Sequence, residues 1–225
     1  MKRILAAIIA AALLLSGCTS ASRPAESAPP TGTPSPSPTP IVTPTPEPEP
    51  ADDELVLVRD YIPGIFIDLK YATTDNFTGR VIYDSDEAYL RYGTVKKLLA
   101  AQNELSGRGL SLKIWDAYRP VSAQFKLWEI CPNPVYVSDP NNGYSKHSRA
   151  NTVDITLVTD TGKSIPMPSG FDDFTSLADR DYSDVSAEAA ENARLLENVM
   201  VENGFVPYSG EWWHYSDSVA YDVYG

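Results

Sequence analysis

Hydrophobic residues recur at every second position in several segments, and this period predicts β-strands. Leu110, Leu112 and Ile114 alternate with polar residues and are typical of a half-buried strand over residues 110–115. The same period predicts a strand over residues 152–158. Two further strands are expected over residues 65–69 and 211–215, the second from its strand-like composition. Because side chains alternate between the two faces of a strand, Asp154 can point into a cleft while its apolar neighbours fill the core.

Apolar residues at helical spacing predict helices between these strands. One helix begins at an N-cap, Thr94, and ends before Gly107 and Gly109. A short helix follows Pro120, with one apolar face formed by Val121, Phe125 and Trp128.

The longest helical signal covers residues 187–203, with Ser186 as N-cap and Gly204 at the position after the C-cap. Residues 205–207 then turn the chain toward the strand at 211–215. We therefore expect an α+β fold: a single domain over residues 53–225, with a small, mostly antiparallel central sheet, flanking helices and a functional site in a cleft.

The first 52 residues differ in composition from this domain. A basic start precedes an unbroken apolar run from Ile4 to Leu15, which is too short to span a bilayer and is typical of a signal peptide over residues 1–17. Leu15-Ser16-Gly17-Cys18 resembles a bacterial lipobox, which implies lipidation of Cys18. Eleven of the nineteen prolines lie between residues 24 and 50, so residues 18–52 are predicted to be an extended linker.

The net charge and the cysteine content of the chain exclude some binding partners and covalent links. The net charge of −12 becomes −14 once Lys2 and Arg3 leave with the signal peptide, which argues against nucleic-acid binding. The two cysteines are Cys18 and Cys131. Lipidation of the first leaves Cys131 unpaired, and we expect it to be a small buried hydrophobe.

The only two histidines of the chain stand beside acidic residues. His147 precedes Asp154 by seven positions, and Glu211 precedes His214 by three. A lone histidine is more often structural than a ligand, but two imidazoles and a carboxylate are the protein ligands of a catalytic zinc with an open fourth position. Glu211 is a natural general base for water in that position. On an ideal strand, however, residues 211 and 214 face opposite sides, so the segment must bend or begin in a turn at Ser209-Gly210.

The combination Ser-x-His-x6-Asp, Glu-x-x-His and Tyr118-Arg119-Pro120 resembles the zinc D-alanyl-D-alanine dipeptidases of the VanX type over roughly residues 55–215. Lys70 to Gly79 and Phe171-Asp172 resemble this branch as well. The family usually has glycine at position 150 and alanine at position 152. If the backbone at Ala150 requires a positive φ, alanine is strained there by about 1 kcal/mol.

The resemblance implies a set of roles for these residues. One zinc per chain is held by His147, Asp154 and His214, with Glu211 and Arg119 as catalytic residues. Four residues are expected to contact the substrate: Tyr71, Asp116, Ser145 and Asp172. The implied reaction is hydrolysis of the D-Ala-D-Ala dipeptide by a lipid-anchored enzyme outside the cytoplasmic membrane.

Two alternatives remain open at this point. A D,D-carboxypeptidase would trim the terminal D-Ala from cell-wall peptides. A wall-binding lipoprotein would retain the site without catalysis. The intact set of candidate ligands, base and arginine argues against the second alternative.

Overall fold

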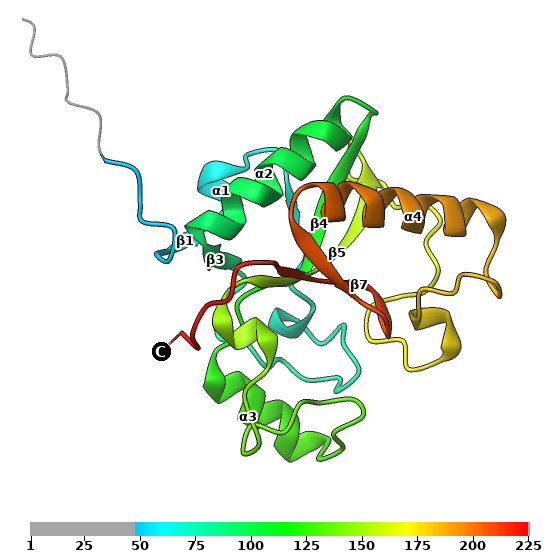
Figure 1. The fold of residues 1–225 in the computed structure, drawn as a ribbon. Helices are drawn as coiled ribbons and strands as arrows, with labels where there is room; N and C mark the ends of the chain where they lie inside the picture. The colour runs from blue at the N-terminus through cyan, green and yellow to red at the C-terminus, as the bar shows by residue number, and fades with distance from the viewer. Residues whose placement is uncertain (1–47, 225) are drawn as a thin grey trace, which may run out of the picture. The chain divides into compact units, whose positions relative to one another are not determined.

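The computed structural model describes residues 48–224 (Figure 1). The predicted signal peptide, Cys18 and nearly all of the linker lie outside the described residues. Within the described part, no helix has the length and apolar character needed to cross a membrane.

A five-stranded sheet forms the centre of the domain, in the order β2-β4-β5-β7-β6. Its strands are β2 (Phe66–Ile67), β4 (Leu110–Asp116), β5 (Thr152–Thr159), β6 (Phe205–Tyr208) and β7 (Glu211–Asp217). Only the β2–β4 pair is parallel, and the other three pairs are antiparallel. The expected α+β fold with a mostly antiparallel sheet is therefore confirmed.

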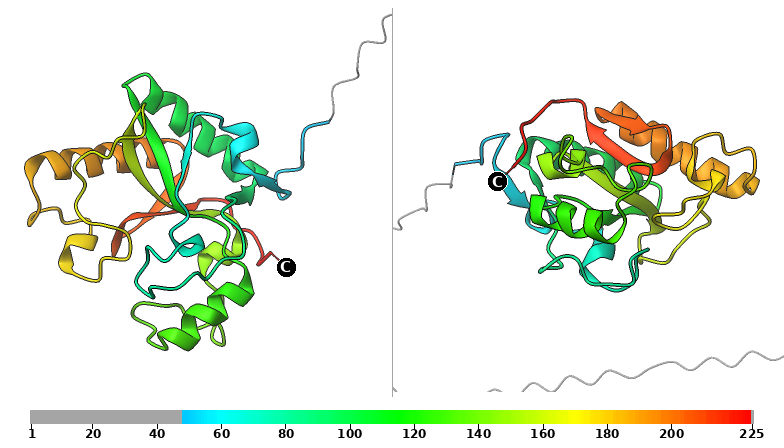
Figure 2. Two further views of the ribbon diagram at one scale, coloured as in Figure 1. Left: turned by 180° about the vertical axis from the view of Figure 1, so that it is seen from behind. Right: turned by 90° about the horizontal axis from the view of Figure 1, so that it is seen from below.

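Two of the three longer helices pack against the sheet. The longer ones are α2 (Tyr92–Ser106), α3 (Val121–Ile130) and α4 (Ala187–Glu202). Helices α2 and α4 contact each other, α2 contacts β4, and α4 contacts β5, β6 and β7. In Figure 1 and in the reverse view of Figure 2, α2 and α4 lie beside the central strands and α3 lies below them.

Smaller elements complete the domain. Strands β1 (Leu55–Leu57) and β3 (Tyr89–Arg91) pair in a separate two-stranded sheet, and α1 (Val58–Tyr61) follows β1. Three 3₁₀ turns are η1 (Lys70–Ala72), η2 (Lys146–Arg149) and η3 (Ser176–Ala178).

The predicted ends of α4 are confirmed, whereas the predicted start of α2 is wrong. The Ser186 side chain accepts a hydrogen bond from the backbone N–H of Ala189, and Gly204 has a φ of +86° just past the C-cap. Helix α2 begins at Tyr92, so Thr94 lies inside its first turn. The Thr94 hydroxyl instead donates to Asp217 Oδ2 (2.8 Å) and ties the helix to β7.

Two other predictions need correction. Helix α3 fully buries Ala123, Gln124 and Leu127. Of the predicted apolar face, Trp128 packs half-buried against the core, whereas Phe125 is 38% exposed. The segment predicted to turn at residues 205–207 is strand β6, paired with β7 along the sheet edge. Cys131 is half-buried rather than fully buried.

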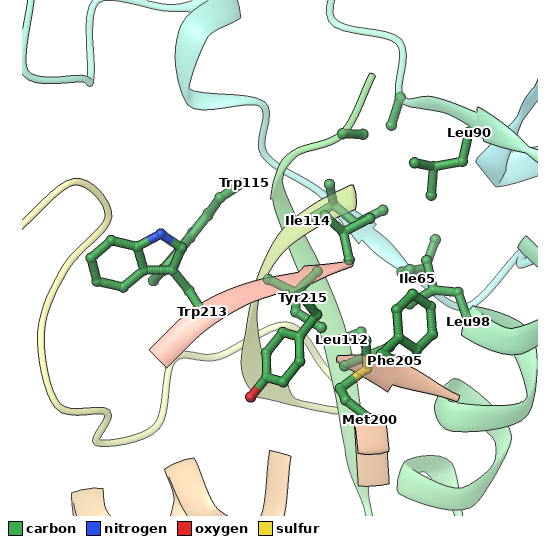
Figure 3. Close-up of a cluster of buried hydrophobic side chains, with 14 of the residues drawn as sticks. Ile65, Leu90, Leu98, Leu112, Ile114, Trp115, Met200, Phe205, Trp213 and Tyr215 are labelled. Atoms are coloured by element: carbon green, nitrogen blue, oxygen red, sulfur yellow. The ribbon is translucent and has the colours of Figure 1, made fainter. Parts of the chain in front are cut away.

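Buried side chains fill both sides of the sheet (Figure 3). Leu98, Met200 and Phe205 group together between the sheet and helices α2 and α4. Trp115 and Trp213 lie apart from them, next to Trp212, whose ring centroid is 5.6 Å from that of Trp115. These aromatic rings, with Tyr71 and Phe171, support the side of the sheet on which the candidate ligands gather.

Candidate active site

Two carboxylates and one imidazole come from paired positions on three adjacent strands. Asp116 on β4 pairs with Asp154 on β5, and Asp154 pairs with His214 on β7. A bulge in β4 between Ile114 and Asp116 shifts the register just before this row. Residues more than 30 positions apart in the sequence are thereby brought to one end of the sheet.

The fourth side chain, His147, comes from the turn η2 that precedes β5. Ser145 is its N-cap and accepts a hydrogen bond from the backbone N–H of His147 (3.3 Å). Ala150 closes the turn with a φ of 58°, so the backbone does require the left-handed conformation there. Alanine at this position carries strain of about 1–2 kcal/mol. Its fully buried methyl group offsets part of that strain, by roughly 0.8 kcal/mol.

One ring nitrogen of His147 is hydrogen-bonded to the backbone, and this bond determines the tautomer of the neutral imidazole. Nδ1 lies 2.9 Å from the carbonyl oxygen of Ala117, and since a carbonyl only accepts, Nδ1 carries the proton. Nε2 is therefore left with its lone pair directed at Asp154 and His214. A backbone carbonyl on the far nitrogen is the usual outer contact of a metal-binding histidine.

The donor atoms of His147, Asp154 and His214 converge. His147 Nε2 lies 3.2 Å from Asp154 Oδ2 and 3.4 Å from His214 Nδ1, which in turn lies 3.0 Å from Asp154 Oδ1. Ligand atoms at about 2.0–2.1 Å from a tetrahedral zinc lie roughly 3.3 Å apart, so the spacing fits. Asp154 Oδ1 is also buried with no hydrogen-bond donor, as expected for an atom that faces a cation.

The electrostatics of Asp154 and His214 favour the protonation states that a metal requires. Burial lowers the pKa of His214, which keeps its imidazole neutral. Burial opposes ionisation of Asp154, but attraction to His147 and the close approach of both imidazoles outweigh it and hold the pKa well below the ordinary value. Burial likewise lowers the pKa of His147, yet the nearby Asp154 charge raises it overall. A cation beside the carboxylate would reverse that last effect.

Strand β7 bends so that Glu211 and His214 reach the same site. The chain turns at Ser209-Gly210, where a Cβ on Gly210 would lie 3.1 Å from the Tyr208 ring. Pro207 pairs with Tyr215, but the next residue, Tyr208, pairs with Glu211, so residues 212–214 are extra on β7. Glu211 Oε2 consequently lies 3.4 Å from His214 Nδ1.

Glu211 has the pKa of a group suited to proton transfer. Burial, followed by repulsion from Asp154 and Asp172, raises its pKa to about 7. The carboxyl group lines the same cavity as the three ligand residues.

Arg119 is held rigidly in the wall of the same cavity. Its Nε and Nη2 donate to Asp116 Oδ2 (3.1 and 2.5 Å), and its Nη1 donates to Gln124 Oε1 (3.0 Å). The guanidinium carbon lies 5.0 Å from the centre of the Tyr71 ring. Burial opposes the charge, but Asp116 beside it raises the pKa of Arg119 well above its ordinary value.

The structure gives Asp116 a different place from the one expected. This carboxylate is fully buried behind Arg119 and does not line the cavity. Its Oδ1 accepts from the Tyr83 hydroxyl (2.5 Å) and from the backbone N–H of Ala117 (2.9 Å). With both oxygens engaged, Asp116 orients Arg119 and has no oxygen left facing the cavity.

The remaining candidate residues line a cavity of about 270 Å³, close to the lower end of the usual size for small-ligand sites. Ser145, Tyr71 and Asp172 all lie on its wall. The Tyr71 hydroxyl donates to Asp172 Oδ2 (2.8 Å). Burial raises the pKa of Asp172 to about 7 against the effect of that hydrogen bond, and the residue has a strained φ of 52°.

Several residues of the site escape analysis of the sequence alone. Gln124 accepts a hydrogen bond from Arg119, and Tyr83 donates one to Asp116, the partner of Arg119. Tyr136 and Tyr208 line the cavity. No period or motif marks them. For Gln124 a signal was available, since an amide inside a short apolar helix requires a partner when buried.

The sequence matches one family model and several curated proteins. The model of the peptidase family M15, described as D-Ala-D-Ala dipeptidase, matches residues 51–222. A D-alanyl-D-alanine dipeptidase of Escherichia coli K12 is 39% identical over 162 residues, which cover 72% of this chain and 83% of the relative. One from Enterococcus faecium is 35% identical, covering 69% of this chain and 87% of the relative.

The likeness to solved structures is more distant. VanYB in complex with D-Ala-D-Ala has 17% identity and a TM-score of 0.41, over 60% of this chain and 75% of that chain. The family model covers most of the domain, and the identity to the curated relatives extends over most of their length. The chain therefore belongs to the D-Ala-D-Ala dipeptidase family of peptidases.

Proposed function

We propose that this chain is a zinc-dependent dipeptidase that hydrolyses D-Ala-D-Ala into two D-alanines. The observation that carries the proposal is the convergence of His147, Asp154 and His214, whose ligand atoms all lie within 4.8 Å of one another. Glu211 and Arg119 line the same cavity. This is the group of residues that metal-assisted peptide hydrolysis requires.

The three ligand residues would hold one zinc ion. Two neutral imidazoles and one carboxylate leave a net charge of +1 on the site. When bound, zinc supplies Lewis acidity, which makes water a nucleophile near neutral pH and polarises the scissile carbonyl.

Glu211 acts as the general base in this proposal. Its carboxylate takes a proton from the attacking water and returns it to the amine that leaves. The pKa of about 7 in the free site falls when a cation is bound beside it, so the carboxylate is ionised and ready at neutral pH.

Arg119 stabilises the negative charge that develops on the carbonyl oxygen. Three of its five N–H groups are engaged by Asp116 and Gln124, so two remain for the substrate. Because the guanidinium is already oriented, little reorganisation is needed in the transition state.

Asp172 and Tyr71 bind the free amino end of the substrate. The buried carboxyl of Asp172 is protonated about half the time near pH 7, and an approaching ammonium group favours its ionised form. A longer peptide brings a neutral amide to the same place and leaves the carboxyl without a charged partner. This pairing favours a dipeptide over a cell-wall pentapeptide and thus a dipeptidase over a D,D-carboxypeptidase.

The proposal is tested by following D-alanine release from D-Ala-D-Ala by the purified chain, with zinc removed and then restored. We expect activity that is lost with a chelator and returns with one equivalent of zinc per chain. L-Ala-L-Ala is the matched control for stereochemistry. A zinc-loaded chain that is inactive on both dipeptides and also on a wall pentapeptide would favour the non-catalytic wall-binding lipoprotein.

We propose further that the enzyme is anchored outside the cytoplasmic membrane through a lipid on Cys18. The support is the lipobox pattern and the proline-rich linker, both in the sequence. An exported enzyme does not reach the cytoplasmic precursor pool, which favours a role in wall turnover over antibiotic resistance. Cys18→Ser should release the protein from the membrane fraction. A wild-type chain that is fully soluble, with a mature N-terminus other than Cys18, would refute the anchor.

A further inference from the structure

Strand β7 needs support for the bend that brings Glu211 and His214 together. Three extra residues, 212–214, stand between the pairs Pro207–Tyr215 and Tyr208–Glu211. A bulge of this kind interrupts the hydrogen bonds between strands, and the backbone groups beside it need other partners. Those partners decide whether the bend keeps its shape.

Arg180 supplies the partners on both sides of the irregularity. Its Nε donates to the carbonyl oxygen of Tyr208 (2.7 Å), and its Nη2 donates to the carbonyl oxygen of His214 (3.1 Å). Tyr208 is the last residue of β6, and His214 is the last of the three extra residues on β7. One planar guanidinium thus spans the bulge and sets the distance between the two strands where they diverge.

The Arg180 side chain is itself firmly held. Its Nη1 donates to Glu197 Oε2 on α4 (2.9 Å) and to the Tyr215 hydroxyl (3.1 Å). Its guanidinium carbon lies 4.6 Å from the centre of the Tyr215 ring. The side chain is only 10% exposed, and Glu197 compensates its charge. Such a side chain has one available geometry, which it imposes on the backbone that it contacts.

We infer that Arg180 is a positioning residue for the metal ligand His214 and the base Glu211, acting through the β6–β7 bulge. This inference rests on the proposed function for its consequence, because the geometry it maintains matters to zinc binding and to proton transfer. Arg180 does not itself line the cavity. Its effect passes through the backbone of His214 and through Tyr208, whose ring packs 5.6 Å from the His214 ring.

The test compares Arg180→Met and Arg180→Lys with wild type. Lysine keeps the charge but cannot donate to two separated carbonyls, so both variants should raise the zinc Kd by about 10- to 100-fold. The Kd is measured by competition with a chromophoric chelator, without substrate. In the zinc-free protein, hydrogen exchange of the amides at 208–215 should also become at least about tenfold faster. If Arg180→Met does not fold, Arg180→Lys decides the question.

Two control variants separate positioning from general stability. Arg194→Met removes an exposed arginine of α4, the helix that also carries Glu197. The Arg194 guanidinium lies over the Tyr182 ring. Val95→Ala destabilises the core on α2, away from the site. Both variants should have a zinc Kd within about twofold of the wild-type value. For Val95→Ala this should hold even though its Tm is lower.

Two results would overturn the inference: Arg180 variants with wild-type zinc Kd and exchange rates, or an equal loss of zinc affinity in Val95→Ala. A wild-type chain that binds no zinc would instead refute the proposed function. The exchange measurement on the zinc-free protein would then still decide whether Arg180 holds the bulge.

Discussion

Asp172 should make the enzyme discriminate between a free and a blocked amino end of its substrate. The perturbation is Asp172→Asn, which keeps the shape of the side chain and an acceptor for Tyr71 but removes the charge. In the wild type, the substrate ammonium meets a carboxylate. In the variant it meets a neutral amide. The variant should therefore lose activity on D-Ala-D-Ala and keep most of its activity on N-acetyl-D-Ala-D-Ala.

The magnitude follows from the environment of the carboxyl. A pKa raised from 3.8 to about 7 means that ionising Asp172 in the free site costs roughly 4 kcal/mol more than in water. An ammonium group in contact recovers half or more of that free energy, about 2–4 kcal/mol, in the partly buried site. The wild type should therefore prefer D-Ala-D-Ala over its N-acetylated form by roughly 30- to 1,000-fold in kcat/KM.

The assay compares kcat/KM for the two substrates in wild type, Asp172→Asn and Asp173→Asn. Asp173 is the matched control because its carboxylate accepts from the backbone N–H and hydroxyl of Thr175 and does not line the cavity. Asp173→Asn should keep the wild-type preference, whereas Asp172→Asn should nearly abolish it. Equal or faster hydrolysis of the N-acetylated substrate by wild type would refute the reasoning and identify a carboxypeptidase.

Three further predictions concern the metal, the base and backbone strain. His147→Ala should lose the zinc found by elemental analysis in wild type, and retention of one equivalent would place the metal elsewhere. Glu211→Gln should keep its zinc but lose at least about 10²-fold in kcat, and near-normal turnover would assign the base to another residue. Ala150→Gly should change the free energy of unfolding by less than about 1 kcal/mol, because relief of left-handed strain offsets the lost methyl and the added chain entropy. The matched change Ala101→Gly, in buried helix α2, should destabilise by about 1.5–2 kcal/mol, and equal losses in urea titrations would contradict the strain argument.

A last prediction concerns pH. The pKa of Asp172 is higher in the folded protein than in the unfolded chain, so the folded state holds this proton more tightly. Its contribution to stability is fully present below about pH 4 and is lost as pH rises through about 7. Relative to wild type, zinc-free Asp172→Asn should therefore become more stable as pH is raised from 4 to 8. Parallel stability curves for the two proteins, from urea titrations across that range, would contradict a raised pKa at this position.

Local patterns in the sequence were sufficient for most of the strands and helices. The period of two found β4 and β5, and composition indicated β7. The Ser186 and Gly204 signals placed the ends of α4, because capping depends on backbone groups within a few residues. The same reasoning failed for Thr94 and for the buried face of α3. Thr94 donates to an aspartate 123 positions away, and the α3 face is selected by what packs against it. Contacts of that range leave no mark on local periodicity.

The chemistry of the site was likewise predictable from the sequence in its residue types but not in its geometry. The residue types at 147, 154, 211 and 214 indicated a metal and a base from the sequence alone, because few side chains can bind zinc or move a proton at neutral pH. Only the tertiary structure decided that Glu211 and His214 share one side of β7, through a bulge that an ideal strand would not have. It also moved Asp116 from the cavity to a position behind Arg119 and brought Arg180 to the backbone of β6 and β7. Side-chain identity is a property of each position, whereas orientation is set by register and packing between segments distant in the chain, and these exist only in the folded protein.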